Sequence, residues 1–388
     1  MKVILFIFAI CFVVVSGKVI KMPLMHSGTV RDRLVKEGKW EEEMGNQFNT
    51  GKSPLIDYWD NFYLINATLG TPGQRFTLVL DTGSSYLWVI DKKCTQNACV
   101  GAAPGTGYVK NRFDATKSTT FVNESKVFQV QYGIGSSNGF FGKDTFSVAG
   151  LSVLQQEAGI AESIATVFQY QPIDGTFGCA WPSLADHVIP PVQNFLSQLD
   201  QPIFTIWMDR IVKPAYDQVG GEVIFGGLNP ENCWGIINWV PLTSKTYWEF
   251  NMGGFMVGDY SMRKQMVAIS DTGTSWILTS QAYIDIIVTK IGAEWDAKTY
   301  QYTVNCTAEM PDLILVINKM DYYISSGEYV LDGGLGNGKC VVTIGAMSAS
   351  PGNPQWNLGA TFIRSYCQIY DIGNARIGFA LAKHQILT

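Results

Sequence analysis

The chain carries one stretch twice: LVLDTGSS at residues 78–85 returns as VAISDTGTS at residues 267–275. In each copy an apolar run leads into Asp-Thr-Gly and then a hydroxyl residue. A shorter match, an apolar residue followed by Gly, lies downstream of each copy, in Thr176-Phe177-Gly178 and in Asn357-Leu358-Gly359. Self-similarity of this kind indicates a duplicated unit. We place the boundary between the two halves near Pro230.

The sequence around the repeats is typical of β-strands. Aromatic and β-branched residues alternate with turn signals such as Gly70-Thr71-Pro72-Gly73. Helical patterns are short, and the clearest runs from Ser280, its expected cap, to Ile291, while a second covers residues 190–199. We therefore predict an all-β protein. The expected strands include residues 58–64, 75–80 and 86–90.

The chain length indicates the number of lobes, and the net charge restricts the class of partner. About 370 residues follow the apolar N-terminal leader, more than one ordinary core holds. We expect two lobes, residues 53–230 with the first repeat and residues 231–388 with the second. The net charge of -5 disfavours nucleic acid as a partner, because phosphate binding needs a clustered basic face.

The repeated Asp-Thr-Gly turns place one carboxylate in each half, on Asp81 and on Asp271. A single such turn is equally well a structural loop cap. A duplicated fold, however, brings the two turns face to face, and two carboxylates within hydrogen-bond reach share one proton. One of them then acts as general base on a water, while the protonated one polarises a carbonyl group. This chemistry needs no metal and no cofactor.

Both turns and their apolar lead-in strands are similar to those of the pepsin-like aspartic proteases, whose paired aspartates are the standard example of a shared proton. The resemblance covers almost the whole chain. Residues 127–136 resemble the flap hairpin of that family, and residues 174–178 resemble the second loop of its first lobe. Its closing strands are similar to residues 362–367 and 371–380. Ile-Ser-Asp-Thr-Gly-Thr-Ser and Arg-Ser-Tyr-Cys resemble nematode members most.

The resemblance implies a bilobal fold and an endopeptidase that works on proteins and peptides in acid as a monomer. Asp81 and Asp271 would be the catalytic pair, and Tyr132 the tyrosine that covers the substrate. The supporting or substrate-binding residues would be Gly83, Ser84, Trp88, Tyr132, Gly133, Gly273 and Thr274. The first-lobe pocket would be lined by Val79, Tyr132, Phe168, Ile173 and Phe177, which favours apolar or aromatic substrate side chains.

Five positions depart from the family pattern. Thr176 and Phe177 stand where aliphatic residues are usual, Cys179 and Trp276 where Leu is usual, and Ala360 where Asp is usual. These departures leave the subsite preference and the bracing of the second turn open.

The N-terminus is typical of an exported protein. An apolar run from Val3 to Val15 ends in Ser16-Gly17, the pattern of a secretory signal peptide. The run covers only about 20 Å, less than a membrane span. We expect residues 1–17 to be the signal, and the mature protein to be secreted or to lie in an acidic compartment such as the lysosome, without a membrane anchor.

Residues 18–52 would form an inhibitory propeptide, by the same resemblance. Residues 19–24 resemble its strand and residues 31–39 its helix. Basic side chains in this segment would pair with carboxylates of the rest of the protein at neutral pH. In acid these carboxylates become protonated, so the attraction is lost. We expect the activating cut between Met44 and Leu55.

Seven cysteines follow the leader, and in an oxidising compartment most of them pair. The resemblance implies disulfides between Cys94 and Cys99 and between Cys306 and Cys340. The nematode-like pattern implies a further disulfide between Cys233 and Cys367. Cys179 would then be a buried free thiol. Sequons that would be open to glycosylation begin at Asn66, Asn123 and Asn305.

Other functional motifs fit less well. Gly135-Ser136-Ser137-Asn138-Gly139 has the form of a hydrolase elbow, but it reads as a hairpin tip rather than a strand-to-helix turn. No cysteine or histidine spacing suggests zinc. Two further readings stay open: a binding module on the same fold with an altered pair, and a glycosidase with two carboxylates.

Overall fold

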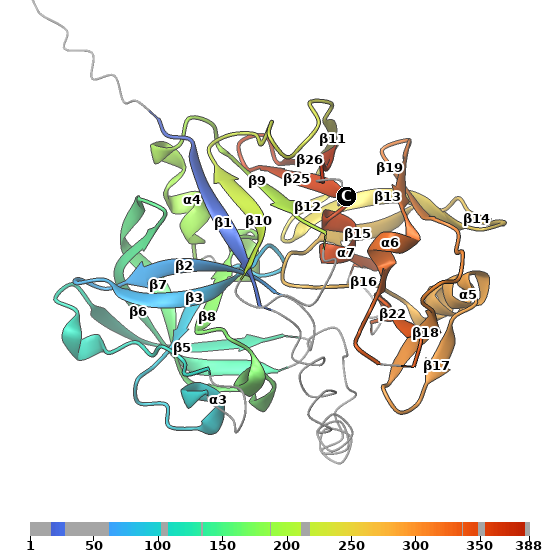
Figure 1. The fold of residues 1–388 in the computed structure, drawn as a ribbon. Coiled ribbons are helices and arrows are strands. Elements are labelled where there is room, and N and C mark those ends of the chain that lie inside the picture. Colours follow the sequence, from blue (N-terminus) through green and yellow to red (C-terminus); the bar gives the residue numbers. More distant parts are fainter. Residues whose placement is uncertain are drawn as a thin grey trace, which may run out of the picture.

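The computed structural model describes residues 17–27, 62–101, 108–132, 135–186, 188–210, 218–335, 337–347 and 354–384. Strands dominate and helices are short (Figure 1), so the predicted all-β class is confirmed. Several predictions fall outside the described residues: most of the signal, the propeptide helix, the expected cut, the flap residue Gly133 and the start of the strand at residues 58–64.

The first repeat lies in a group of four strands. β3 (Gln74–Asp81) ends in the first aspartate and runs parallel to β8 (Gly175–Gly178). β4 (Leu87–Ile90) pairs antiparallel with β8 and parallel with β7 (Leu151–Ile164).

The second repeat has the same pairing. β15 (Met266–Ser270) runs parallel to β24 (Trp356–Leu358), and Asp271 follows directly. β16 (Ile277–Thr279) is antiparallel to β24 and parallel to β23 (Ile344–Ala346). The sequence repeat is therefore also a repeat of strand order and direction.

Within the described ranges, the largest sheet has 13 strands and includes strands from both sides of Pro230. β9 (Ile203–Met208) pairs with β10 (Gln218–Phe225) on one side and with β25 (Tyr366–Asp371) on the other. The two halves of the sequence are thus joined by backbone hydrogen bonds. The sheet also holds β2 (Tyr63–Leu69), β5 (Val122–Gln131), β6 (Ser136–Val148), β11 (Asn238–Pro241) and β26 (Arg376–Leu381).

A second sheet of nine strands and a third of four lie within the second half. Besides β15, β16, β23 and β24, the nine-stranded sheet holds β12 (Ser244–Lys245), β13 (Trp248–Val257), β14 (Tyr260–Met262), β19 (Leu313–Ile317) and β20 (Met320–Ile324). The third sheet is made of β17 (Glu294–Asp296), β18 (Gln301–Asn305), β21 (Val330–Leu331) and β22 (Lys339–Val342).

The first described strand, β1 (Ile20–His26), lies inside the largest sheet, between β10 and β2. It belongs to the segment that the sequence predicts as a propeptide. Leu24 and His26 are buried, and Lys21 Nζ lies 2.5 Å from Glu231 Oε1 in an exposed ion pair. Exposed pairs contribute little, so backbone pairing and apolar burial hold β1 in place.

Helices are few in the described part of the chain. The predicted helix at residues 280–291 is confirmed as α5 (Gln281–Ile291), which ends at the left-handed Gly292. The predicted helix at residues 190–199 is broken into α4 (Pro191–Asn194) and a 3-10 turn (Leu196–Gln198). The other α-helices of the described residues are α3 (Asn97–Val100), α6 (Ser326–Tyr329) and α7 (Ala360–Ile363).

All three predicted disulfides are present: Cys94–Cys99, Cys233–Cys367 and Cys306–Cys340. Cys179 is free and buried, as predicted. The three sequon asparagines, Asn66, Asn123 and Asn305, are exposed; their glycosylation stays a prediction.

Candidate active site

The two Asp-Thr-Gly turns meet through a reciprocal set of hydrogen bonds. The backbone N–H of Thr82 donates to the hydroxyl of Thr272 at 3.0 Å, and the N–H of Thr272 donates to the hydroxyl of Thr82 at 3.0 Å. The hydroxyls in turn donate across the site, to the carbonyls of Ser270 and Leu80. Each loop therefore fixes the other, and all these groups are buried.

The carboxyl groups of Asp81 and Asp271 receive matching donors. The N–H two residues on donates to Oδ1 in each case, from Gly83 at 2.8 Å and from Gly273 at 2.9 Å. A hydroxyl three residues on donates to Oδ2, from Ser84 in the first turn and from Thr274 at 2.7 Å in the second. These four hydrogen bonds are the contacts through which the residues would support the carboxyls, the role that the sequence predicts for them.

The glycines matter because the opposite carboxyl lies against them. A Cβ atom at Gly83 would stand 2.4 Å from Asp271 Cγ, and one at Gly273 would stand 2.4 Å from Asp81 Oδ1. Real Cβ contacts are essentially never shorter than 3.0 Å. Glycine is thus required by the close approach of the two turns.

Burial and the facing carboxyl of Asp271 raise the pKa of Asp81 well above its usual value, against the donors Ser84 and Gly83. Desolvation penalises the charged form, and a second negative charge nearby penalises it further. The pair therefore retains a proton at pH values where a lone aspartate has lost it.

A pocket of about 310 Å³ opens over the carboxyls. Tyr132 lies in its wall, and the indole N–H of Trp88 donates to the Tyr132 hydroxyl at 2.8 Å. Trp88 therefore holds the hydroxyl of Tyr132, while the covering role of this tyrosine stays a prediction. The lining is Asp81, Gly83, Ser84, Ser85, Tyr86, Val130, Gln131, Tyr132, Leu184, Tyr247, Ile269, Asp271, Gly273, Thr274, Met347, Pro354 and Asn357.

The predicted apolar lining is placed differently. Val79, Phe168 and Ile173 form a buried cluster that packs against Tyr132, behind the pocket wall. The prediction for Phe177 is wrong: it lies in the main core, with its ring 5.5 Å from that of Phe146. Neighbouring residues of a strand face opposite sides, and in β8 Phe177 takes the core side.

Several residues of the site were not assigned a role from the sequence, Asn357 and Tyr247 among them. Asn357 Nδ2 donates to Asp271 Oδ2 at 2.7 Å, a third donor that has no amide counterpart in the first half, where Thr176 holds the equivalent register position. Tyr247 lines the pocket from the turn between β12 and β13, and burial together with both aspartates raises its pKa. The repeat of Asn357-Leu358-Gly359 was the one available signal for Asn357.

The positions that depart from the family pattern serve packing and bracing. Trp276 packs with Leu278 and Val341 in a small buried cluster. Ala360 braces the second turn through its backbone, whose N–H donates to the carbonyl of Thr274 at 2.8 Å.

The alternative hydrolase elbow has no suitable geometry. Ser137 is fully buried within β6 and pairs with Val130 on one side and Ile164 on the other, so no strand-to-helix turn presents it. Among the residues that the structure describes, no three histidine, cysteine or acidic side chains gather as a metal site would require.

Comparison with known proteins gives a consistent result. The family model described as eukaryotic aspartyl protease matches residues 62–382. The chain is 47% identical over 382 residues to Aspartic protease 1 of Caenorhabditis elegans, covering 95% of this chain and 96% of that protein. It is 45% identical over 377 residues to Aspartic protease 17 of the same nematode, with 95% and 96% covered. Human gastricsin is 32% identical over 397 residues, with 96% and 98% covered.

Proposed function

The chain belongs to the eukaryotic aspartyl proteases and is an aspartic-type endopeptidase, and on this premise we propose that Asp81 and Asp271 cut the peptide bond by activating a water between them. The observation that carries the proposal is the reciprocal bonding of Thr82 and Thr272, which sets two carboxyls with matching donors against each other. The family match sets the glycosidase hypothesis aside.

In the proposed reaction the pair begins with one proton. The ionised carboxyl accepts a proton from the water, whose oxygen attacks the peptide carbonyl carbon, while the protonated carboxyl donates to the carbonyl oxygen. The tetrahedral species collapses as the carboxyl that took the proton of the water passes it to the nitrogen, and the other carboxyl recovers its proton from the oxygen. The C–N bond then breaks to leave a carboxylic acid and an amine. Gly83, Ser84, Gly273 and Thr274 hold the carboxyls in place throughout.

Tyr132 would close over the bound peptide, because it lies on the pocket wall with its hydroxyl tied to Trp88. Apolar residues of the pocket lining, among them Val130, Leu184 and Ile269, favour peptides with apolar or aromatic side chains next to the cut bond. The natural substrates are proposed to be proteins and peptides, and the enzyme to act as a monomer of two lobes, residues 53–230 and 231–388.

The test is the loss of one carboxylate at a time. Asp81→Asn and Asp271→Asn each remove the shared-proton system. Each alone should abolish peptide digestion in acid, while the thermal unfolding transition stays cooperative. Asp285→Asn, in the exposed side of α5, is the matched control and should keep full activity. Normal turnover by Asp271→Asn would show that the mechanism is wrong.

We also propose that the protein is made as a zymogen, with residues 18–52 as its propeptide. The support is that β1 precedes the catalytic body and is built into its largest sheet, with Lys21 paired to Glu231. Acid can break that ion pair but leaves the backbone pairing of β1, so loss of the Lys21–Glu231 attraction alone would not release this strand.

The zymogen proposal is tested by mass measurement of the intact protein before and after acidification. A cut between Met44 and Leu55 should accompany the onset of activity. Full digestion of substrate at neutral pH by a protein that retains its first residues would refute the proposal. A protein begun at Ser53 is a weaker test, because it loses β1, a strand of the largest sheet, together with the rest of the propeptide.

The remaining part of the proposal concerns location. No helix in the described ranges is long and apolar enough to cross a membrane. The leader, the disulfides and the exposed sequons support export through the secretory pathway, to the outside or to an acidic compartment such as the lysosome.

A further inference from the structure

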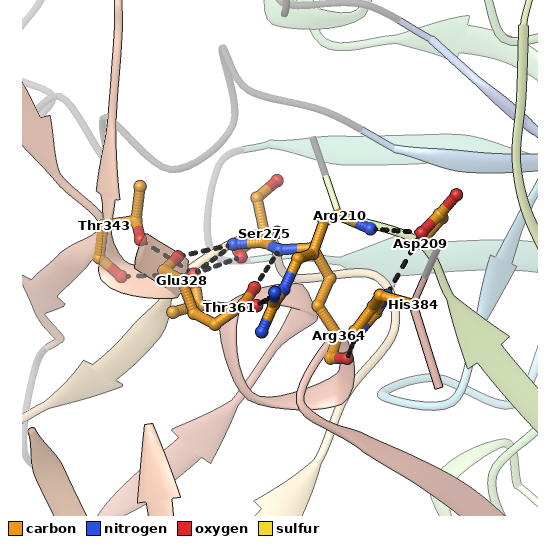
Figure 2. A network of polar contacts seen from close by, with 8 residues as sticks. All are labelled: Asp209, Arg210, Ser275, Glu328, Thr343, Thr361, Arg364 and His384. Atoms are coloured by element: carbon orange, nitrogen blue, oxygen red, sulfur yellow. Dashed lines mark hydrogen bonds and ion pairs between the residues drawn. The ribbon is translucent and has the colours of Figure 1, made fainter. Parts of the chain in front are cut away.

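Buried polar side chains connect α7 to the second catalytic turn (Figure 2). Thr361 makes two hydrogen bonds to the carbonyl oxygen of Ser275, from its N–H at 3.0 Å and from its hydroxyl at 3.1 Å. Ser275 is buried and closes the turn that begins at Asp271. The position of α7 therefore determines where this end of the turn lies.

Arg364 holds the C-terminal end of α7. Its guanidinium is buried, and it donates to Glu328 Oε2 at 3.3 Å and to the Glu328 carbonyl at 2.8 Å. Glu328, equally buried in α6, also accepts a bond from Arg210 Nε. Such charges keep one geometry, because leaving either of them unpaired is costly.

His384 joins this network from the last described residues of the chain. Its Nε2 lies 2.7 Å from the carbonyl oxygen of Arg364, and its Nδ1 lies 3.1 Å from Asp209 Oδ1. The imidazole side chain is only 9% exposed. The segment is docked by its neighbours, since the indole N–H of Trp207 donates to the carbonyl of Lys383.

Both partners of the His384 ring are acceptors. A carbonyl oxygen never donates, and an ionised carboxylate never donates, so each ring nitrogen needs its own proton. Only the imidazolium form has two N–H groups. The hydrogen bond from His384 lowers the pKa of Asp209, which keeps that carboxylate ionised in acid.

The other titratable and charged groups around the ring come from several elements. Arg210 stands next to Asp209, and the Arg364–Glu328 pair lies behind the carbonyl. Tyr63 of β2 lies near Arg364, and burial raises its pKa to about 12. The tyrosine is therefore neutral from acid to neutral pH and adds no charge beside the network.

We propose that His384 is a positioning residue: as an imidazolium it ties Asp209 to the end of α7 and so holds the second catalytic turn in its working geometry in acid. The inference rests on the proposed role of Asp271. When the ring loses a proton, Nδ1 presents a lone pair to a carboxylate, and the tie to Asp209 breaks while the bond to the Arg364 carbonyl persists.

Steady-state kinetics across the acid to neutral range test the proposal in the full chain after acid activation. His384→Ala should lower kcat on the order of tenfold with KM unchanged within about twofold, because the turn and not the pocket is misplaced. In Asp209→Asn the amide pairs with a neutral ring as well as with a charged one. This variant should therefore keep wild-type kcat in acid and lose less of it toward neutral pH.

Lys383→Gln is the matched control. Lys383 lies in the same segment but contacts the Pro230 carbonyl and the Trp234 ring, so its loss should leave the pH profile unchanged. A His384→Ala variant with the wild-type kcat and the wild-type pH profile would overturn the proposal.

A second measurement is independent of turnover. Hydrogen exchange at residues 271–276 and 360–365, in an Asp81→Asn background that cannot digest itself, should show protection that falls from about pH 5 to about pH 7.5 after correction for intrinsic rates. Asp209→Asn should suppress that fall. An NMR titration with His384 uncharged at about pH 5 would refute the proposal. Activity of Asp271→Asn would instead refute the proposed function and leave the exchange result standing.

Discussion

Gly83→Ala tests how tightly the two catalytic turns are packed. The added Cβ would stand 2.4 Å from Asp271 Cγ, about 1 Å inside the 3.4 Å at which ordinary contact begins, so the Asp271 carboxyl or one of the turns has to move by roughly that amount. A misplacement of about 1 Å costs on the order of 100-fold in rate, or about 2.7 kcal/mol in the activation barrier. The backbone of Gly83 requires no left-handed conformation, so this contact is the whole reason for the effect.

The assay is peptide hydrolysis in acid, with kcat and KM determined separately and the urea midpoint recorded. We expect kcat to fall about 100-fold, KM to change little, and stability to fall by about 1–3 kcal/mol from overpacking. Gly235→Ala is the control, because nothing lies within 4 Å of its added Cβ. Gly273→Ala should behave as Gly83→Ala does. A folded Gly83→Ala enzyme with near-normal kcat would refute this account of the site.

Three further predictions follow from named contacts. Trp88→Phe removes the donor to the flap tyrosine, so kcat/KM should fall roughly 2- to 10-fold, the value of about 0.5–1.5 kcal/mol for one hydrogen bond. Asn357→Thr removes one donor to the carboxyl pair, so the acid limb of the rate profile should move to higher pH; an unchanged limb would contradict the role of the amide. Because its pKa is raised, Asp81 binds a proton on folding, and stability is lost as the pH rises from its unfolded value through its folded value. The unfolding midpoint of Asp81→Asn should therefore rise relative to that of the wild type as the pH increases. If the two midpoints change in parallel with pH, the raised pKa of Asp81 does not lower the stability of the wild type.

The sequence was sufficient for features that repeat locally. The two Asp-Thr-Gly turns, their glycines and their hydroxyl donors were readable because each motif carries its own partners within three residues. The close approach of Gly83 to Asp271 was not, because it depends on where the other half of the fold lies.

Features that depend on distant pairing were missed for the same reason. The break in the helix at residues 190–199, the inward direction of Phe177 and the pairing of β9 with β25 are consequences of tertiary packing. Arg364 appeared in the sequence only as part of a family-like closing pattern. Its partner Glu328 lies in a separate helix, and no local spacing connects the two.

The position of β1 also has a consequence for how the chain assembles during synthesis. This strand leaves the ribosome first, yet Ile20 pairs with Phe225, made roughly 200 residues later. β9 also pairs with β25, which lies close to the end of the chain and is synthesised much later. The largest sheet is therefore completed only when nearly all of the polypeptide has been released. Such distant contacts make folding slow and leave strand edges open to aggregation meanwhile.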